Sequence, residues 1–245
     1  MFDRWKLQDF APGEGAARHA FAEQFDTSGW IDISAPGDVH QALMEVGRIA
    51  DPFYDRNEDT CAWMEEREWW YRLRMESKEP PLRSDERLLL VFQGLDTFVT
   101  LWLNGELLGE HANMFSEAVF DVSRRWHTNG SNTLALCFHP PLKQVEDTSF
   151  ETWGRNPARV LMRKAQFGYG WDWGPRLPTI GIWRPVELRR ERYACIQGIH
   201  FSTLDIDTQN NKALVAVEAE VERFGGDQAV TLSLALLAPD TAGGT

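Results

Sequence analysis

The sequence has few cysteines, and none has the spacing of a metal site. The 245 residues include three, Cys61, Cys137 and Cys195, which lie far apart and form neither a CxxC nor a CxxH pair. An odd, widely scattered set does not predict a disulfide framework or a zinc site. We therefore expect reduced, buried thiols, no bound metal and no cofactor.

The chain also lacks an excess of positive charge and a long apolar run. Its 25 Lys and Arg residues face 37 Asp and Glu residues, so the formal net charge is −12. Nucleic acid is not an expected partner, because there is no basic stripe to neutralise phosphates. No run approaches the about 18 apolar residues of a transmembrane helix, and the start MFDRWKLQDF does not resemble a signal peptide. The sequence thus predicts no membrane partner and a cytoplasmic location, provided that Met1 is the native start.

What the sequence does have is a series of short apolar segments separated by turns. Apolar residues make up 43% of the chain, which is enough for a packed core. Many short strands at a spacing of about ten residues, with few helices, are typical of an all-β antiparallel sandwich of the jelly-roll type. The segments expected to be strands are 70–75, 87–92, 98–103, 115–122 and 133–138, with one or two more before residue 35 and a loop around Gly130.

Two local signals predict particular elements. Asn104 and Gly105 lie between the runs LWL and ELL, and this dipeptide favours a type I′ hairpin turn, which needs positive φ at both positions. Asp38 is expected to cap a short helix over 39–46, which Gly47 would end.

A calcium-loop pattern lies between Asp55 and Glu66. Asp55, Asn57, Asp59 and Glu66 occupy positions 1, 3, 5 and 12 of the loop template, but position 6, where the sharp turn needs Gly, is Thr60. We therefore expect no calcium there.

A second series of strands begins after residue 192. Three runs are expected to be strands, at 195–203, 213–221 and 229–237. An immunoglobulin-like sandwich needs about seven strands, so this series is too short for a complete one. We predict a jelly-roll domain over 1–192 and the incomplete beginning of an immunoglobulin-like β-sandwich over 193–245. The chain is accordingly expected to be a fragment.

The most unusual stretch of the chain is 163–185, RKAQFGYGWDWGPRLPTIGIWRP. Trp171, Asp172 and Trp173 place one carboxylate between two indoles, and Gly174-Pro175 then prevent a helix or a central strand. An acid beside flat apolar rings suits a sugar, whose hydroxyls need acceptors and whose C–H faces pack on aromatic rings. The alternative is a buried turn in which Asp172 caps backbone amides.

Further predictions concern the two ends of this stretch and the segment that precedes it. Residues 163–167 predict a strand, in which Arg163 and Lys164 either pair with acids or are solvated. Residues 181–189 predict a closing strand. The polar segment 140–157 either lies at the edge of a sugar site or is a solvated loop.

The stretch resembles the signature that closes the amino-terminal domain of β-mannosidases of glycoside hydrolase family 2, whose fold is a galactose-binding-like jelly roll. Other family-like runs follow one another in the family's order and cover about residues 30–190. They are PGDVHQAL (36–43), IADPFYDRNE (49–58), WWY (69–71), GLDT (94–97), LNG (103–105), NMF (113–115) and GIWR (181–184).

This resemblance implies a role in hydrolysing terminal non-reducing β-D-mannose residues by a retaining mechanism, which uses two carboxyl groups. In the family both are glutamates of a barrel domain, so the catalytic residues are expected outside this chain, and the chain alone should be inactive. Asp172 would accept hydrogen bonds from the mannose hydroxyls, and Trp171 and Trp173 would form the pocket wall. The expected partners are β-mannosides or mannose-containing oligosaccharides and the protein's own carboxy-terminal domains. The alternative is a free-standing, non-catalytic carbohydrate-binding or adaptor module.

Overall fold

The chain forms two compact units of β-structure, seen in a computed structural model that describes residues 2–145, 157–226 and 229–235. One unit comprises Met1–Pro81 and Leu88–Arg189, and the other comprises Leu82–Arg87 and Arg190–Thr245. The domain boundary after residue 192 stays a prediction, because compactness alone does not define a domain. No helix in the described part of the chain is both long enough and apolar enough to cross a bilayer.

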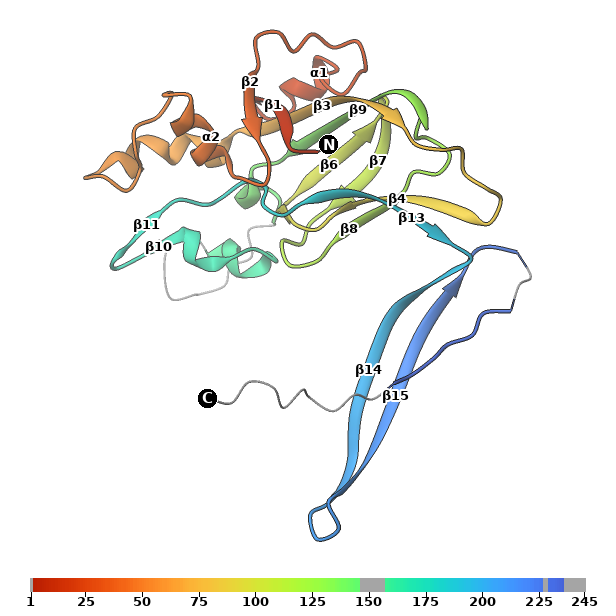
Figure 1. Cartoon of the computed structure of the whole chain (residues 1–245). Helices are drawn as coiled ribbons and strands as arrows, with labels where there is room; N and C mark the ends of the chain where they lie inside the picture. The colour runs from red at the N-terminus through yellow and green to blue at the C-terminus, as the bar shows by residue number, and fades with distance from the viewer. Residues whose placement is uncertain (1, 146–156, 227–228, 236–245) are drawn as a thin grey trace, which may run out of the picture. The chain divides into compact units, whose positions relative to one another are not determined.

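The first unit is built around a six-stranded antiparallel sheet, in which β3 and β9 lie at the centre (Figure 1). β3 and β9 pair from Trp69 opposite Phe138 to Lys78 opposite Asn129. In spatial order the strands are β2 (Ile31–Ser34), β1 (Arg4–Phe10), β3 (Glu68–Lys78), β9 (Asn129–Phe138), β6 (Val99–Leu103) and β7 (Glu106–His111).

A smaller sheet forms the second layer (Figure 1). Its order is β13 (Val186–Arg192), β4 (Glu86–Phe92) and β8 (Ala118–Asp121), and the short strands β5 (Leu95–Asp96) and β12 (Gly181–Ile182) pair beside it. Because buried leucine, valine and aromatic side chains of both sheets make up the core, the expected all-β sandwich is confirmed.

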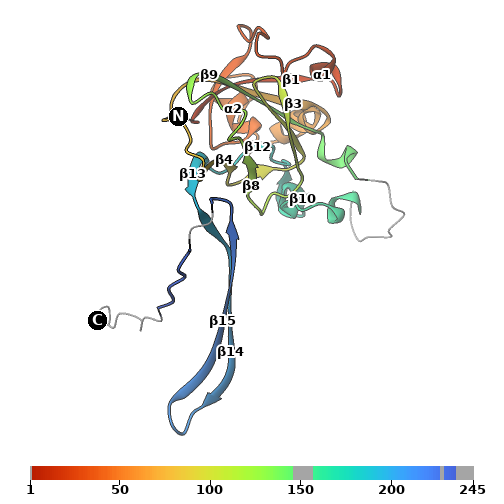
Figure 2. The same cartoon turned by 90° about the vertical axis from the view of Figure 1, so that its right-hand side faces the viewer.

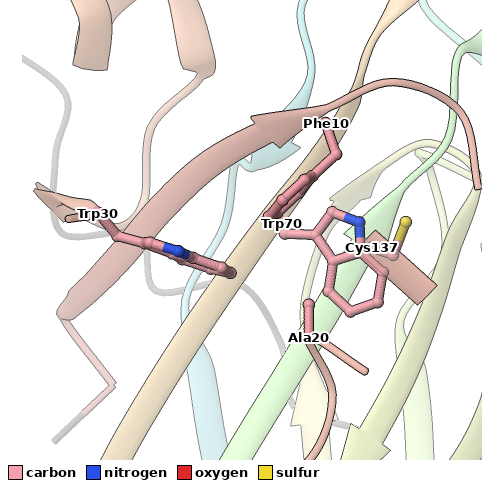
Figure 3. Close-up of a cluster of buried hydrophobic side chains, with 5 residues drawn as sticks. All are labelled: Phe10, Ala20, Trp30, Trp70 and Cys137. Carbon is pink, nitrogen blue, oxygen red and sulfur yellow. The ribbon is translucent and has the colours of Figure 1, made fainter. Parts of the chain in front are cut away.

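Aromatic side chains fill one end of this core. Phe10, Ala20, Trp30, Trp70 and Cys137 form a buried cluster, with one residue each from β1, β3 and β9 (Figure 3). The Trp70 ring also stacks on Trp102, with 5.2 Å between the ring centroids. Trp30 and Trp70 are structural, since both are buried, and the partly buried Trp102 packs against the cluster.

The helices in the described part of the chain are few and short. They are α1 (Glu14–Ala17), α2 (Val39–Glu45) and the 3₁₀ helices η1 (Asn57–Glu66), η2 (Pro141–Lys143), η3 (Pro157–Leu161) and η4 (Gln166–Gly168). The predicted cap of α2 is confirmed, because the Asp38 carboxylate accepts hydrogen bonds from the backbone amides of His40 and Gln41. The predicted Asn104-Gly105 turn is confirmed too, with φ of 53° and 79°.

Several local expectations are wrong. The single closing strand expected over 181–189 is interrupted, because β12 ends at Ile182 and β13 begins at Val186. Residues 163–167 are not a strand: Arg163 makes one isolated bridge to Asn113, and η4 begins at Gln166. The loop around Gly130 is instead the first part of β9, where it pairs with the far end of β3. Cys195 is half-buried rather than buried, whereas Cys61 and Cys137 are buried as expected, and all three are free thiols.

The second unit contains one long antiparallel hairpin, formed by β14 (Ala194–Asp207) and β15 (Lys212–Arg223) (Figure 2). The strands predicted at 195–203 and 213–221 are confirmed. The third, at 229–237, is wrong for its described part, since residues 229–235 have no strand structure. An apolar run becomes a strand only where a neighbouring strand takes its hydrogen bonds, so the run alone was an insufficient signal.

Candidate functional site

Trp171, Asp172 and Trp173 lie at the tip of a small β-hairpin. Its strands are β10 (Tyr169–Trp171) and β11 (Gly174–Arg176), with Tyr169 opposite Arg176 and Trp171 opposite Gly174. Asp172 and Trp173 are therefore the two turn residues. Pro175 is tolerated in β11 because this two-stranded ribbon consists of edge strands only.

The three side chains at the tip are exposed. Trp171 and Trp173 retain 66% and 86% of their accessible surface, and Asp172 is also exposed. The alternative of a buried turn, in which Asp172 caps backbone amides, does not fit this geometry. An exposed acid flanked by two exposed indoles is free to contact a ligand or another part of a protein.

The base of the hairpin is anchored to η1 through Arg176. The Arg176 amide donates to Glu58 Oε2 at 2.9 Å, and its guanidinium Nη2 donates to both carboxylate oxygens of Glu65 at 2.7 Å. The same guanidinium lies 5.4 Å from the centre of the Tyr169 ring, which is near enough for a cation–π contact. Glu58 therefore has a structural role as a hydrogen-bond acceptor for β11.

The residues of the calcium-loop pattern do not form a loop. Asn57, Asp59 and Glu66 belong to the 3₁₀ helix η1, which has no place for the sharp turn of the calcium site. Asp59 forms an ion pair with Arg56 at 2.9 Å, and Glu66 forms one with Lys143 at 2.6 Å. Asp59 and Glu66 thus each have a cationic partner within the protein.

Lys164 forms a buried ion pair with Asp96, which the sequence analysis identified only in part. Lys164 was expected to pair with an acid or to be solvated, and the structure pairs its Nζ with Asp96 Oδ1 at 2.5 Å. Burial lowers the pKa of the Lys164 ammonium, and the charge of Asp96 partly offsets this effect. Arg163 is exposed. The available signal was Asp96, an acid between the apolar runs 87–92 and 98–103, because a buried carboxylate needs a partner.

One group of side chains in the described residues has possible metal-ligating atoms that all lie within 4.8 Å of one another. It consists of Glu68, Cys137 and His139. Glu68 Oε1 lies 3.3 Å from His139 Nδ1, and Glu68 Oε2 accepts a hydrogen bond from Trp70 Nε1 at 3.4 Å. Burial, together with the negative charge of Glu68, raises the pKa of the Cys137 thiol far above its usual range. The contacts of Glu68 with His139 and Trp70 fit a hydrogen-bonded core group.

The segment 140–157, considered as a possible edge of the site, lies mostly outside the described residues. Its first part, 140–145, includes η2 (Pro141–Lys143), and the lysine of η2 forms the ion pair with Glu66. None of the described residues of this segment adds a contact to the hairpin tip among the hydrogen bonds and ion pairs observed for 2–145 and 157–226.

Comparison with known proteins agrees with the predicted fold and family. Residues 6–184 match the family described as glycosyl hydrolase 2 galactose-binding domain-like, and the chain belongs to this family. It is 34% identical over 204 residues to β-mannosidase B of Emericella nidulans, and 32% identical over 227 residues to β-mannosidase B of Neosartorya fischeri. The crystal structure of the β-D-mannosidase of Dictyoglomus thermophilum superimposes with a TM-score of 0.74 at 31% identity.

The chain spans only part of each of these relatives. The alignments cover 80% and 89% of this chain, but 24% and 26% of the two fungal proteins. For the Dictyoglomus structure the shares are 90% of this chain and 26% of that chain. The chain therefore resembles the amino-terminal domain of such β-mannosidases, and about three quarters of each relative has no counterpart in it.

Proposed function

We propose that the chain is the substrate-recognition part of a β-mannosidase. The complete protein would remove terminal non-reducing β-D-mannose residues by a retaining mechanism, with both catalytic carboxyl groups outside these 245 residues. The observation that carries the proposal is the exposed Trp171-Asp172-Trp173 tip on an anchored hairpin. The resemblance to β-mannosidases supports the choice of sugar.

The chemistry of the tip suits a role in binding rather than in bond cleavage. An ionised carboxylate only accepts hydrogen bonds, and a sugar offers it a pair of neighbouring hydroxyl donors. Each such bond contributes about 1.5–3 kcal/mol, which distinguishes between sugars but gives a dissociation constant no tighter than about millimolar on its own. The indoles at positions 171 and 173 would pack on the C–H faces of the ring.

The test uses the complete protein and nitrophenyl β-mannoside. Asp172→Asn keeps the size of the side chain but loses the charge, and we expect kcat/KM to fall by about tenfold or more because ionic hydrogen bonds are lost. Asp32→Asn is the matched control, since that exposed aspartate of β2 pairs with Lys6 of β1 and does not belong to η1, which anchors the hairpin. Unchanged kinetics in Asp172→Asn would contradict the proposal.

The alternative is a carbohydrate-binding or adaptor module that works without a catalytic domain. It predicts that the 245-residue chain alone binds mannosides more tightly than millimolar, whereas our proposal predicts weak or undetectable binding and no hydrolysis by this chain. Titration calorimetry with β-1,4-mannobiose, together with an assay of the chain on nitrophenyl β-mannoside, separates the two.

A further inference from the structure

Asp96 lies at the centre of a buried polar group that joins the two ends of the loop carrying the tip. Its Oδ1 accepts from Lys164 Nζ at 2.5 Å, and its Oδ2 accepts from Thr179 Oγ1 at 2.6 Å. Lys164 Nζ donates a further bond to the Thr179 carbonyl oxygen, also at 2.5 Å. The side chains of Asp96 and Lys164 are each 1% exposed, so water does not compete for these bonds.

Two of the three residues of this group flank the segment that carries the tip, and the third belongs to a strand. Lys164 comes directly before the segment 165–178, which contains η4, β10 and β11, and Thr179 comes directly after it. Asp96 belongs to β5, where it lies opposite Gly181 of β12. The carboxylate is therefore fixed by the sheet and connects both ends of the segment to it.

Stability alone is a weak reason for this arrangement. Burying two charges costs desolvation energy, and a well-packed apolar group of the same volume often does as well or better. Holding the ends of a segment together, by contrast, removes conformational freedom from every residue between them. An exposed tip benefits directly, because its own side chains have few contacts that could order it.

We propose that Asp96, Lys164 and Thr179 form a clamp that positions the hairpin, so that Asp172 and its neighbouring indoles meet a ligand in one orientation. Asp96 is thus a positioning residue, which acts through the segment it fastens and does not touch the sugar. The expected effect on activity rests on the proposed function, whereas the expected effect on the order of residues 165–178 does not.

The test replaces the hydroxyl of Thr179 in the complete protein, because changing either charged partner would leave the other buried and alone. Thr179→Val loses the donor to Asp96 Oδ2 at nearly constant volume, and Thr179→Ser keeps it. Thr100→Val is the control: it also loses a partly buried hydroxyl contact, at 2.8 Å from His139 Nε2 in the large sheet.

In Thr179→Val we expect amide hydrogen exchange in 165–178 to become about tenfold faster, since a hydrogen bond to a charged group is lost. KM for nitrophenyl β-mannoside should rise by about tenfold with little change in kcat, because the clamp orders the free protein before substrate arrives. Thr179→Ser should remain close to the wild type in both measurements.

The two measurements separate the clamp from the proposed function. If exchange in 165–178 is the same in Thr179→Val as in Thr100→Val, the clamp does not exist. Faster exchange with unchanged KM would support the clamp and contradict the role of the tip in binding mannosides. If exchange in Thr179→Ser is as fast as in Thr179→Val, the clamp is also overturned, because the hydroxyl that bonds to Asp96 would then not be what orders the segment.

Discussion

At the scale of single residues, tryptophan has two distinct uses in this protein. Trp5, Trp69 and Trp70 are almost completely buried, whereas Trp171 and Trp173 are exposed at the hairpin tip. A buried indole stabilises the fold through the apolar area that it removes from water. An exposed indole contributes little to the fold, so its presence calls for a reason outside stability.

This contrast can be tested with one pair of variants. Trp173→Ala should change the free energy of unfolding by less than about 0.5 kcal/mol, as is usual for exposed positions, while kcat/KM of the complete protein falls. Trp70→Ala should cost about 3–5 kcal/mol, because it leaves a cavity in the aromatic cluster. Urea denaturation of both variants measures the difference, and a large loss of stability in Trp173→Ala would argue for a structural role of the tip.

Asp38 gives a prediction for pH. Burial alone would raise the pKa of this carboxyl, but the side-chain bond and charge of His40 and the amides of Gln41 and His40 hold it below the ordinary value of 3.8. Since the folded state binds the proton more weakly than the unfolded state, the stability from ionised Asp38 is fully present above about pH 4. It is lost as the pH falls through the lowered pKa.

The matched variant is Asp38→Asn, because Asn caps a helix about as well as Asp but does not titrate. The wild type should be the more stable protein near neutral pH, and its advantage should shrink below about pH 4. Urea denaturation of both proteins at a series of pH values provides the measurement. A constant advantage at all pH values would contradict the lowered pKa of the Asp38 carboxyl.

At the scale of elements, the sequence was sufficient to predict those helices and turns whose formation depends only on neighbouring residues. The cap of α2 and the Asn104-Gly105 turn depend only on neighbouring residues, and both were predicted correctly. The segment 163–167 was wrongly predicted as a strand. Its conformation depends in part on the buried Lys164, which pairs with Asp96, a residue remote in the sequence. Long-range partners of this kind leave no periodic pattern.

The Asn104-Gly105 turn allows a sharp test of backbone conformation. Gly105→Ala should destabilise the protein by about 1–2 kcal/mol, because φ of 79° is strained for a residue with a Cβ atom. Space is not the obstacle, since the nearest atom to the added Cβ would be 3.8 Å away. Gly198→Ala is the control, as it has open space and no positive φ, and it should have almost no effect in thermal unfolding.

At the scale of the whole molecule, the all-β sandwich was predictable and the second series of strands was only partly so. The first unit has two sheets that cover each other's apolar faces. The alternation of apolar and polar residues, together with the turn residues between the runs, was therefore enough to predict its strands. The second unit has the paired strands β14 and β15, whose apolar residues are largely exposed. They include Ile196, Ile199, Phe201, Leu204, Ile206 and Leu214.

This difference predicts unequal stability within the 245-residue chain. A two-stranded ribbon without a covered face is marginal in water, so the amides of β14 and β15 should exchange much faster than those of β3 and β9. Hydrogen exchange followed by mass spectrometry of peptides measures both regions in one sample. Equal protection would show that the ribbon is covered in solution.

The two-residue turn of the β10–β11 hairpin has one more consequence. Asp172 and Trp173 are held at their positions by strands and by an arginine whose bonds do not involve the turn itself. The scaffold and the proposed recognition surface are therefore separable, so a library randomised at these two positions should yield folded proteins almost throughout. Altered sugar preference could then be selected for, or evolve, without first having to rescue folding.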